Sequence, residues 1–260
     1  MSELFNLGGR SALVTGANTG LGQAIAVALA QAGADIVALG RGDASSCAGT
    51  AAQVAAAGRR FSFVQADLSG AAPVTSTVQH VVAGALAASP QGRLDILVNN
   101  AGIIRRADSL DVTEEDWDAV INTNLKSLFF LSQAAAAHMA QHGGGKIINV
   151  ASLLSFQGGI RVPAYTASKS AVAGLTRALA NEWAAQGINV NALAPGYFDT
   201  NNTAALKADP DRNASILARI PAGRWGQPPD LGGAAVFLAS RASDYVHGIV
   251  LPVDGGWLAR

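Results

Sequence analysis

The sequence predicts an α/β fold, with a doubly wound parallel sheet of about seven strands and helices on both faces. Short β-branched apolar runs alternate with longer Ala-rich stretches along the chain, and this alternation is typical of right-handed βαβ units. The apolar runs are hydrophobic almost throughout, as expected of parallel strands that are covered on both faces. No long linker, repeat or low-complexity segment divides the sequence. We therefore expect a single domain over residues 1–260.

Each predicted element follows from its local sequence. Seven short apolar runs predict strands at 11–16, 34–39, 61–66, 94–100, 146–152, 188–194 and 247–253. The stretches between them predict helices near 20–32, 44–57, 73–88, 113–141, 163–186 and 229–240. Thr113 can cap the fourth helix and acids follow it in TEED, although Asp116 stands where a full capping box has Glu or Gln.

The segment 199–217 is more polar than its surroundings and follows the carboxyl end of a predicted strand. Ligands of open α/β sheets bind at that edge of the sheet. We therefore expect this segment to form a mobile flap over a substrate.

Composition excludes several classes of protein. Half of the residues are hydrophobic and 14% are charged, which allows a large buried core. Basic and acidic residues balance at 18 each, so nothing indicates a nucleic-acid partner.

The apolar run at 24–40 is broken by Gly33 and Asp35, and no signal peptide precedes it, so we expect no membrane contact. Cys47 is the single cysteine and is expected to be inert in a reducing cytoplasm. No cluster of His, Cys or Asp has the spacing of metal ligands.

The first predicted strand leads into TGANTGLG at 15–22 and then directly into a helix. Glycines in this context allow a sharp turn, a close approach of the backbone to a phosphate, and close packing of the helix on the strand. The turn predicts a Rossmann-type dinucleotide site; a merely flexible turn is the alternative. The residues expected to contact the dinucleotide here are Gly16, Asn18, Thr19, Gly20, Leu21 and Gly22.

The ends of the second and third strands bear on the choice of cofactor. Gly40 occupies the position where an acid would bind a ribose 2′-hydroxyl, and Arg41 follows it. This favours NADP(H), unless Arg41 stacks on adenine or faces solvent. Asp67 and Leu68, in QADLS, are candidates for contacting adenine, but Asp67 is equally suited to cap a helix.

The motif YTASK places Tyr165 four residues before Lys169, so the two share one face if the segment is helical. A free phenol has a pKa of about 10. An ammonium within about 4–6 Å favours the phenolate and lowers this pKa. We therefore predict that Tyr165 is a general acid/base. Ser152, at the end of the fifth strand, can hydrogen-bond the substrate oxygen. A surface tyrosine and a strand-end cap are the ordinary alternatives for these two residues.

Taken together, TGANTGLG, NNAG at 99–102, Ser152 and YTASK resemble the short-chain dehydrogenase/reductase family. The motifs occur in the family's order, and Ser152 precedes Tyr165 by the usual 13 residues. The endings PAGRWGQPPDLGGAAVFLAS and VDGGW are also similar, so the resemblance covers essentially the whole chain.

The resemblance implies an oxidoreductase that transfers a hydride between NAD or NADP and a ketone or secondary alcohol. It implies a catalytic set in which Lys169 also reaches the nicotinamide ribose and Asn124 supports Lys169 through a water. Asn99 could equally be structural, tying adjacent strands together. The remaining residues that the resemblance places near the cofactor are Asn99, Ala101, Gly102, Pro195, Gly196 and Thr200.

Several longer segments, among them NNAGIIRR, SLLSFQGGIRVPAYTASK and APGYFDTNNT, resemble the subgroup of 2-deoxy-D-gluconate 3-dehydrogenases, also called 2-dehydro-3-deoxy-D-gluconate 5-dehydrogenases. This subgroup is NAD-linked, in contrast to the reading of Arg41. A sugar acid needs a cation for its carboxylate. Arg106 and Arg161 are preferred over Arg105 for this role, with ordinary surface charge as the alternative.

Two other functions remain open at this stage. The same fold supports 3-oxoacyl reductases and general alcohol dehydrogenases, and a catalytically silent NAD(P)-binding sensor is a third reading. The apolar helices at 113–141 and 163–186 suggest a helix-mediated oligomer. The family resemblance implies a homotetramer.

Overall fold

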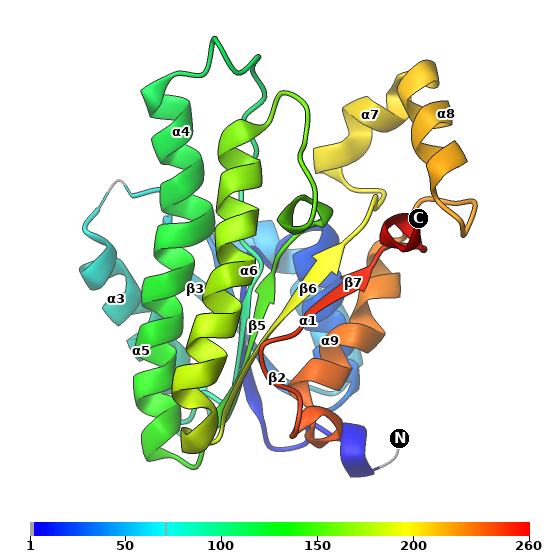
Figure 1. Cartoon of the computed structure of the whole chain (residues 1–260). Coiled ribbons are helices and arrows are strands. Elements are labelled where there is room, and N and C mark those ends of the chain that lie inside the picture. The colour runs from blue at the N-terminus through cyan, green and yellow to red at the C-terminus, as the bar shows by residue number, and fades with distance from the viewer. Residues whose placement is uncertain (1–2, 71) are drawn as a thin grey trace.

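A sheet of seven parallel strands forms the centre of the fold, in the order β3-β2-β1-β4-β5-β6-β7 (Figure 1). The computed structural model describes residues 3–70 and 72–260. The order of the strands reverses between β1 and β4, and ligands of such sheets bind at the carboxyl ends of the strands beside this point. The strands are β1 (Ser11–Thr15), β2 (Asp35–Gly40), β3 (Phe61–Gln65), β4 (Ile96–Asn99), β5 (Gly145–Val150), β6 (Ile188–Pro195) and β7 (Val250–Val253).

Helices cover both faces of the sheet (Figure 1). One face packs against α1 (Gly20–Gln31), α2 (Ala48–Ala56) and α9 (Gly232–Ala239). The other packs against α3 (Val74–Ala88), α5 (Ser127–Gln141) and α6 (Pro163–Trp183). The predicted doubly wound parallel sheet with helices on both faces is confirmed.

The continuous hydrophobicity of the strands reflects burial on both sides. All five residues of β1 are buried. Ala12 and Val14 pack into the core on the α1 side, whereas Leu13 packs into the core on the α5 side. Neighbouring side chains of a strand point to opposite faces, so a strand covered by two helical layers has apolar residues at consecutive positions in its centre, as Ala12, Leu13 and Val14 do here.

The predicted helix at 113–141 is divided into three parts. They are α4 (Glu114–Ile121), a π-helical turn (Asn122–Lys126) and α5. Thr113 caps α4 as predicted, since its hydroxyl accepts a hydrogen bond from the backbone N–H of Asp116 at 3.2 Å.

Two helices that the sequence pattern did not predict occupy most of the polar segment 199–217, α7 (Ala204–Ala208) and α8 (Pro210–Arg219), and the second extends two residues beyond it. Figure 1 shows them above the ends of β6 and β7. Asp209 caps α8, because its carboxylate accepts hydrogen bonds from the N–H groups of Asp211 and Arg212, both at 3.1 Å. Asp-Pro at a helix start is a recognisable signal, which the polar composition of the segment obscured.

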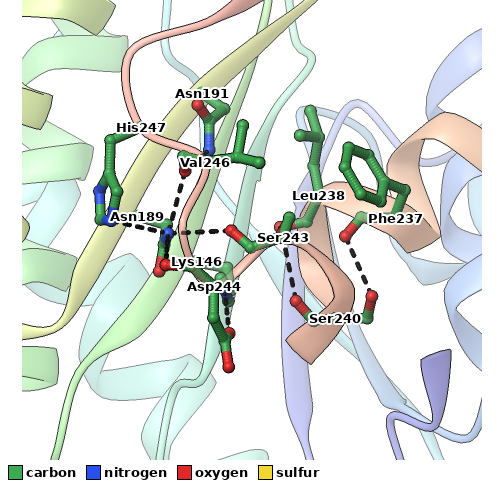
Figure 2. Close-up of polar contacts among 10 residues, drawn as sticks. All are labelled: Lys146, Asn189, Asn191, Phe237, Leu238, Ser240, Ser243, Asp244, Val246 and His247. Atoms are coloured by element: carbon green, nitrogen blue, oxygen red, sulfur yellow. Dashed lines mark hydrogen bonds and ion pairs between the residues drawn. The ribbon is translucent and has the colours of Figure 1, made fainter. Parts of the chain in front are cut away.

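Polar contacts at the amino-terminal edge of the sheet hold the segment that leads into β7 (Figure 2). Asn189 Nδ2 lies 3.2, 3.0 and 3.0 Å from the carbonyl oxygens of Ser243, Asp244 and Val246. Lys146 Nζ donates to the Asp244 carboxylate at 2.7 Å. These contacts join β5 and β6 to the last strand, at the opposite end from the candidate site.

Candidate active site

Two adjoining cavities lie at the carboxyl ends of the central strands. The glycine cavity, about 250 Å³, is bordered by the turn after β1, the loop after β4 and α6. The α8 cavity, about 460 Å³, is bordered by the loop after β5 and by α7 and α8. Residues that line both are Leu21, Val150, Tyr165, Thr200 and Asn202. A ligand that fills one cavity can therefore meet a ligand in the other beside Tyr165.

The turn after β1 forms a cradle that only glycine accommodates at key positions. Gly20 has a φ of 57°, in the left-handed region. A Cβ at Gly22 would lie 2.1 Å from the carbonyl oxygen of Gly16. Thr19 caps α1 without a side-chain hydrogen bond to any described residue, so the first-turn N–H groups can bind an anion. The turn fits the pyrophosphate of a dinucleotide.

Most of the predicted cofactor-binding residues border these cavities. Pro195 and Gly196 line the α8 cavity. Those that line the glycine cavity are Gly16, Thr19, Gly20, Leu21, Gly22, Ala101, Gly102, Tyr165, Lys169 and Thr200.

Besides Asn99, four predicted cofactor residues lie outside the described lining of both cavities. Asn18, Arg41 and Asp67 are exposed. The Asp67 carboxylate accepts a hydrogen bond from the N–H of Ser69 at 2.9 Å. This contact lies in a turn and caps no helix, because α3 begins at Val74 with Pro73 at its cap. Leu68 packs against the core on the α5 side. Contacts of these four residues with the adenosine end of a cofactor stay predictions.

Asn99 lies outside the described lining of both cavities, and its approach to a cofactor stays a prediction. Asn99 is buried, and its Nδ2 donates to Ser132 Oγ and to Asn149 Oδ1, each at 2.9 Å. It therefore ties β4 to β5 and α5, the structural alternative. The next residue, Asn100, was missed. Its Nδ2 donates to the carbonyl oxygens of Thr15 and Gly16 at 3.0 and 3.2 Å, and it lines the glycine cavity.

The structure brings Ser152, Tyr165 and Lys169 together. Lys169 Nζ lies 5.6 Å from the centroid of the Tyr165 ring and donates to the carbonyl oxygen of Val150 at 2.5 Å. Ser155 Oγ accepts from the N–H of Ser152 at 3.3 Å and donates to the carbonyl oxygen of Lys169 at 2.6 Å. The turn that carries Ser152 is thereby fixed against the helix that carries the phenol and the ammonium.

The pKa of Tyr165 differs from expectation. Burial raises the pKa of the phenol, while a hydrogen bond from Ser152 and the positive charge of Arg106 act in the opposite direction. Burial also lowers the pKa of Lys169 to about 8. The expected net lowering of this pKa is not found, because loss of water around the phenol outweighs the effects of Ser152 and Arg106. An effect of Lys169 on the phenol stays a prediction. At neutral pH the phenol carries its proton and can donate it.

Asn124 lies on the π-helical turn, a geometry that is frequent at functional sites. Its Oδ1 accepts from the N–H of Ile103 at 2.8 Å, and its Nδ2 donates to the carbonyl oxygen of Ile103 at 2.9 Å and to Ser168 Oγ at 3.3 Å. The side chain thus fastens the loop after β4 to α6, one residue before Lys169. Support of Lys169 by Asn124 through a water stays a prediction.

The two arginines predicted to bind a substrate carboxylate have different positions. Arg106 lines the α8 cavity, and its Nη2 donates to the carbonyl oxygen of Asn202 at 3.1 Å. Arg161 lies outside the described lining of that cavity, and its Nε pairs with the Asp108 carboxylate at 3.1 Å. The position of Arg161 does not favour the predicted contact with a carboxylate, because the chain turns there with a φ of 65° and an exposed acid pairs with the side chain. Its role in binding the substrate stays a prediction.

Sequence reasoning missed two further arginines, Arg212 and Arg219, which line the α8 cavity. They are seven residues apart on α8, and this spacing places them on one face. The spacing is visible in the sequence once the helix is recognised. Among the described residues that line this cavity, three are arginines and none is Asp or Glu. The cavity is therefore suited to an anion.

Comparison with known proteins agrees with this geometry. A family model described as enoyl-(acyl carrier protein) reductase matches residues 16–258. The chain is 59% identical to the 2-dehydro-3-deoxy-D-gluconate 5-dehydrogenase of Escherichia coli K12 over 257 residues, 98% of each protein. The chain belongs to the short-chain dehydrogenase/reductase family. The predicted membership, and with it an NAD(P)-dependent oxidoreductase, is confirmed.

Other members of the short-chain dehydrogenase/reductase family are similarly close. The 2-dehydro-3-deoxy-D-gluconate 5-dehydrogenase of Bacillus subtilis is 56% identical over 260 residues, 100% of this chain and 99% of that protein. A solved structure from Agrobacterium tumefaciens, assigned as a 2-deoxy-D-gluconate 3-dehydrogenase with bound NADP, is 57% identical. It has a TM-score of 0.89, and the match covers 100% of both chains.

The described residues contain neither a candidate metal centre nor a candidate membrane-spanning helix. Within 3–70 and 72–260, no group of three or more His, Cys, Asp or Glu side chains could hold a metal ion. Across the same ranges, no helix has the length and apolar character needed to cross a bilayer. Cys47 is buried, and burial raises the pKa of its thiol, which makes it a poor nucleophile.

Proposed function

We propose that the protein interconverts a ketone and a secondary alcohol on a deoxy-keto sugar acid, of the 2-deoxy-D-gluconate or 2-dehydro-3-deoxy-D-gluconate type. One observation carries the proposal: the cavity that contains Ser152 and Tyr165 is also lined by Arg106, Arg212 and Arg219 and by no described acid. The reacting groups and the charge that an acid needs therefore share one space. The names of the close relatives support the same substrate class.

The roles of the residues follow from their positions. When bound, a nicotinamide cofactor would supply the hydride-transfer chemistry. Ser152 holds the substrate oxygen beside the phenol, and Tyr165 gives or takes the proton at that oxygen. Lys169 borders the glycine cavity and can donate hydrogen bonds to a ribose there. The residues that would hold the pyrophosphate are in the turn from Gly16 to Gly22.

A screen of substrates tests this function directly. We expect kcat/KM for 2-dehydro-3-deoxy-D-gluconate or 2-deoxy-D-gluconate to exceed that for an acetoacetyl thioester or a simple secondary alcohol by at least about 100-fold, since buried polar groups reject partners that leave them unpaired. Steady-state assays with NAD(H) and NADP(H) provide the measurement. Preference for the thioester would replace the proposal by a 3-oxoacyl reductase. Tight cofactor binding with no turnover of any substrate would indicate a sensor.

We propose that the preferred cofactor is NADP(H), and the same steady-state assays compare it with NAD(H). A Cβ at Gly40 would lie 3.2 Å from the Phe63 ring, so the position that would carry an acid for the ribose is crowded. Arg41 follows it and is exposed. Arg41→Ala is expected to weaken the affinity for NADPH about 10- to 100-fold and to change the affinity for NADH little. Equal weakening of both would remove Arg41 from recognition of the 2′-phosphate.

We further propose that the protein is a homotetramer in which α5 and α6 meet a second copy. A shallow apolar hollow of the described surface lies between Leu125, Phe129, Phe130 and Leu175. Gly174, in the same hollow, has open space around its Cβ position, which lets a second helix approach closely. Light scattering after size exclusion should give about four times the 26.3 kDa of one chain. A mass of one chain at micromolar concentration would refute the proposal.

We also place the protein in the cytoplasm. A single buried cysteine cannot form an internal disulfide, and this usage fits a reducing compartment. Cell fractionation that recovers the activity outside the cytoplasm would contradict this location.

A further inference from the structure

Arg219 is held in a fixed orientation at the wall of the α8 cavity. Its guanidinium carbon lies 4.0 Å from the centroid of the Trp257 ring. Its Nη2 donates to Gln157 Oε1 at 3.2 Å, and Trp257 Nε1 donates to the same oxygen at 3.3 Å. Stacking on Trp257 and the hydrogen bond to the Gln157 amide oxygen therefore fix the Arg219 guanidinium before any ligand binds. Such preorganisation reduces the entropy that binding costs.

The backbone beneath Arg219 is also secured. Arg260 Nε donates to the carbonyl oxygen of Arg219 at 3.3 Å, and Arg260 Nη2 donates to that of Ala218 at 2.7 Å. These bonds satisfy carbonyl groups at the end of α8, where a helix otherwise leaves them without partners. The end of α8 is thus bound to the C-terminal segment that carries Trp257 (Figure 1).

Charge around Arg219 is uncompensated within the cavity. A guanidinium has five N–H donors, and no carboxylate of the described residues forms an ion pair with Arg219 or Arg212. By contrast, Arg105 and Arg161, outside the cavity, pair with Asp116 and Asp108. The whole chain carries equal numbers of acids and bases. The excess of positive charge is therefore local to this cavity.

Arg106 occupies a different part of the same cavity. It lies in the loop after β4, and its positive charge acts on the Tyr165 phenol. Arg219 stands instead with Trp257 and Gln157. A substrate whose reacting oxygen lies at Ser152 and Tyr165 would therefore meet two cations in different places.

We propose that Arg219, oriented by Trp257 and Gln157, anchors the carboxylate of the substrate, and that Arg106 acts beside the reacting oxygen. This inference rests on the proposed function and assigns the specificity for acids to α8. The planar fork of the guanidinium matches a carboxylate in two parallel hydrogen bonds. Because the anchor lies on the segment over the site, an acid substrate also holds α8 against the cavity.

The test compares an acid with the same molecule lacking its charge. With 2-dehydro-3-deoxy-D-gluconate, Arg219→Gln is expected to raise KM about 10- to 100-fold and to change kcat less than about threefold, since hydrogen bonds to a charged group are lost from ground and transition states alike. With the methyl ester of that acid, KM should be the same in both proteins within about twofold. Arg241→Gln, at the amino-terminal edge of the sheet, is the matched control and should leave both substrates unchanged.

A second variant keeps the test decisive if Arg219→Gln fails to fold. Arg219→Lys retains the charge but not the planar fork, so we expect an intermediate rise of KM for the acid and none for the ester. Equal effects on acid and ester, or no effect on either, would overturn the anchor while leaving the proposed function intact. Failure of the wild-type protein to turn over any sugar acid would instead refute the proposed function.

Discussion

Replacing Tyr165 with Phe is expected to lower kcat about 10²- to 10⁴-fold, the usual range for loss of a general acid/base. The phenol borders both cavities, and the Ser152 hydrogen bond acts on it. Affinity for the cofactor should stay within about twofold, because the turn from Gly16 to Gly22 is untouched. Steady-state kinetics and a fluorescence titration with NADPH measure the two quantities separately. Tyr245→Phe is the control, since Tyr245 is fully exposed.

The direction of the pKa shift adds a dependence on pH. Since burial raises the pKa of Tyr165, the phenol is protonated at neutral pH and is ready to donate to a forming alkoxide. Ketone reduction should therefore be insensitive to pH near neutrality, whereas alcohol oxidation should accelerate as the pH rises. The Phe variant should lose this rise in oxidation. Wild-type turnover in Tyr165→Phe would exclude the phenol from proton transfer.

The parts of the site that could be predicted from sequence depend on short spacings. TGANTGLG lies within one strand, turn and helix, so the roles of Gly16 and Gly22 are local. Tyr165 and Lys169 are four residues apart on α6, and the helix itself brings them to one face. The order of strands and helices likewise determines which edge of the sheet binds ligands.

The rest of the site depends on contacts between distant segments. Arg161 is close to Tyr165 in sequence, yet the backbone turn and Asp108 hold it outside the α8 cavity. Arg219 is far from Tyr165 in sequence, yet α8 brings it to the same cavity. The pKa of Tyr165 also depends on burial, which spacing along a helix does not reveal.

Replacing Lys169 with Met should inactivate the protein and yet stabilise it at pH 7. Lys169 is 4% exposed, and burial lowers its pKa from 10.5 to about 8. A shift of this size corresponds to about 3 kcal/mol of folding free energy lost while the lysine is protonated in both states. The Met variant also loses the hydrogen bond to the Val150 carbonyl, which destabilises it by about 1–2 kcal/mol and offsets part of this gain. We expect a net gain of about 1–2 kcal/mol, measured by urea denaturation of the cofactor-free protein.

The advantage of the Met variant should disappear as the pH rises. Between pH 8 and 10.5 the unfolded chain binds a proton at Lys169 that the folded chain does not, so the wild-type protein gains stability through this window. Below pH 8 both states are protonated and the cost of burial is complete. The difference between the two proteins, measured at pH 7 and 9.5, isolates this group from other titrations. Lys207→Met, on exposed α7, should change stability by less than about 0.5 kcal/mol at either pH.

A Met variant that is less stable than wild type by the same amount at both values of pH would contradict the argument. Lys169 would then contribute to the fold through its packing and hydrogen bond, with no cost from its charge. The expected result instead identifies a buried ammonium that weakens the fold in order to border the glycine cavity beside Tyr165. Residues that serve a reaction commonly reduce stability in this way. Opposite changes in activity and stability would therefore identify Lys169 as a residue that serves the reaction at a cost to the fold, and the stability change is measured without any substrate.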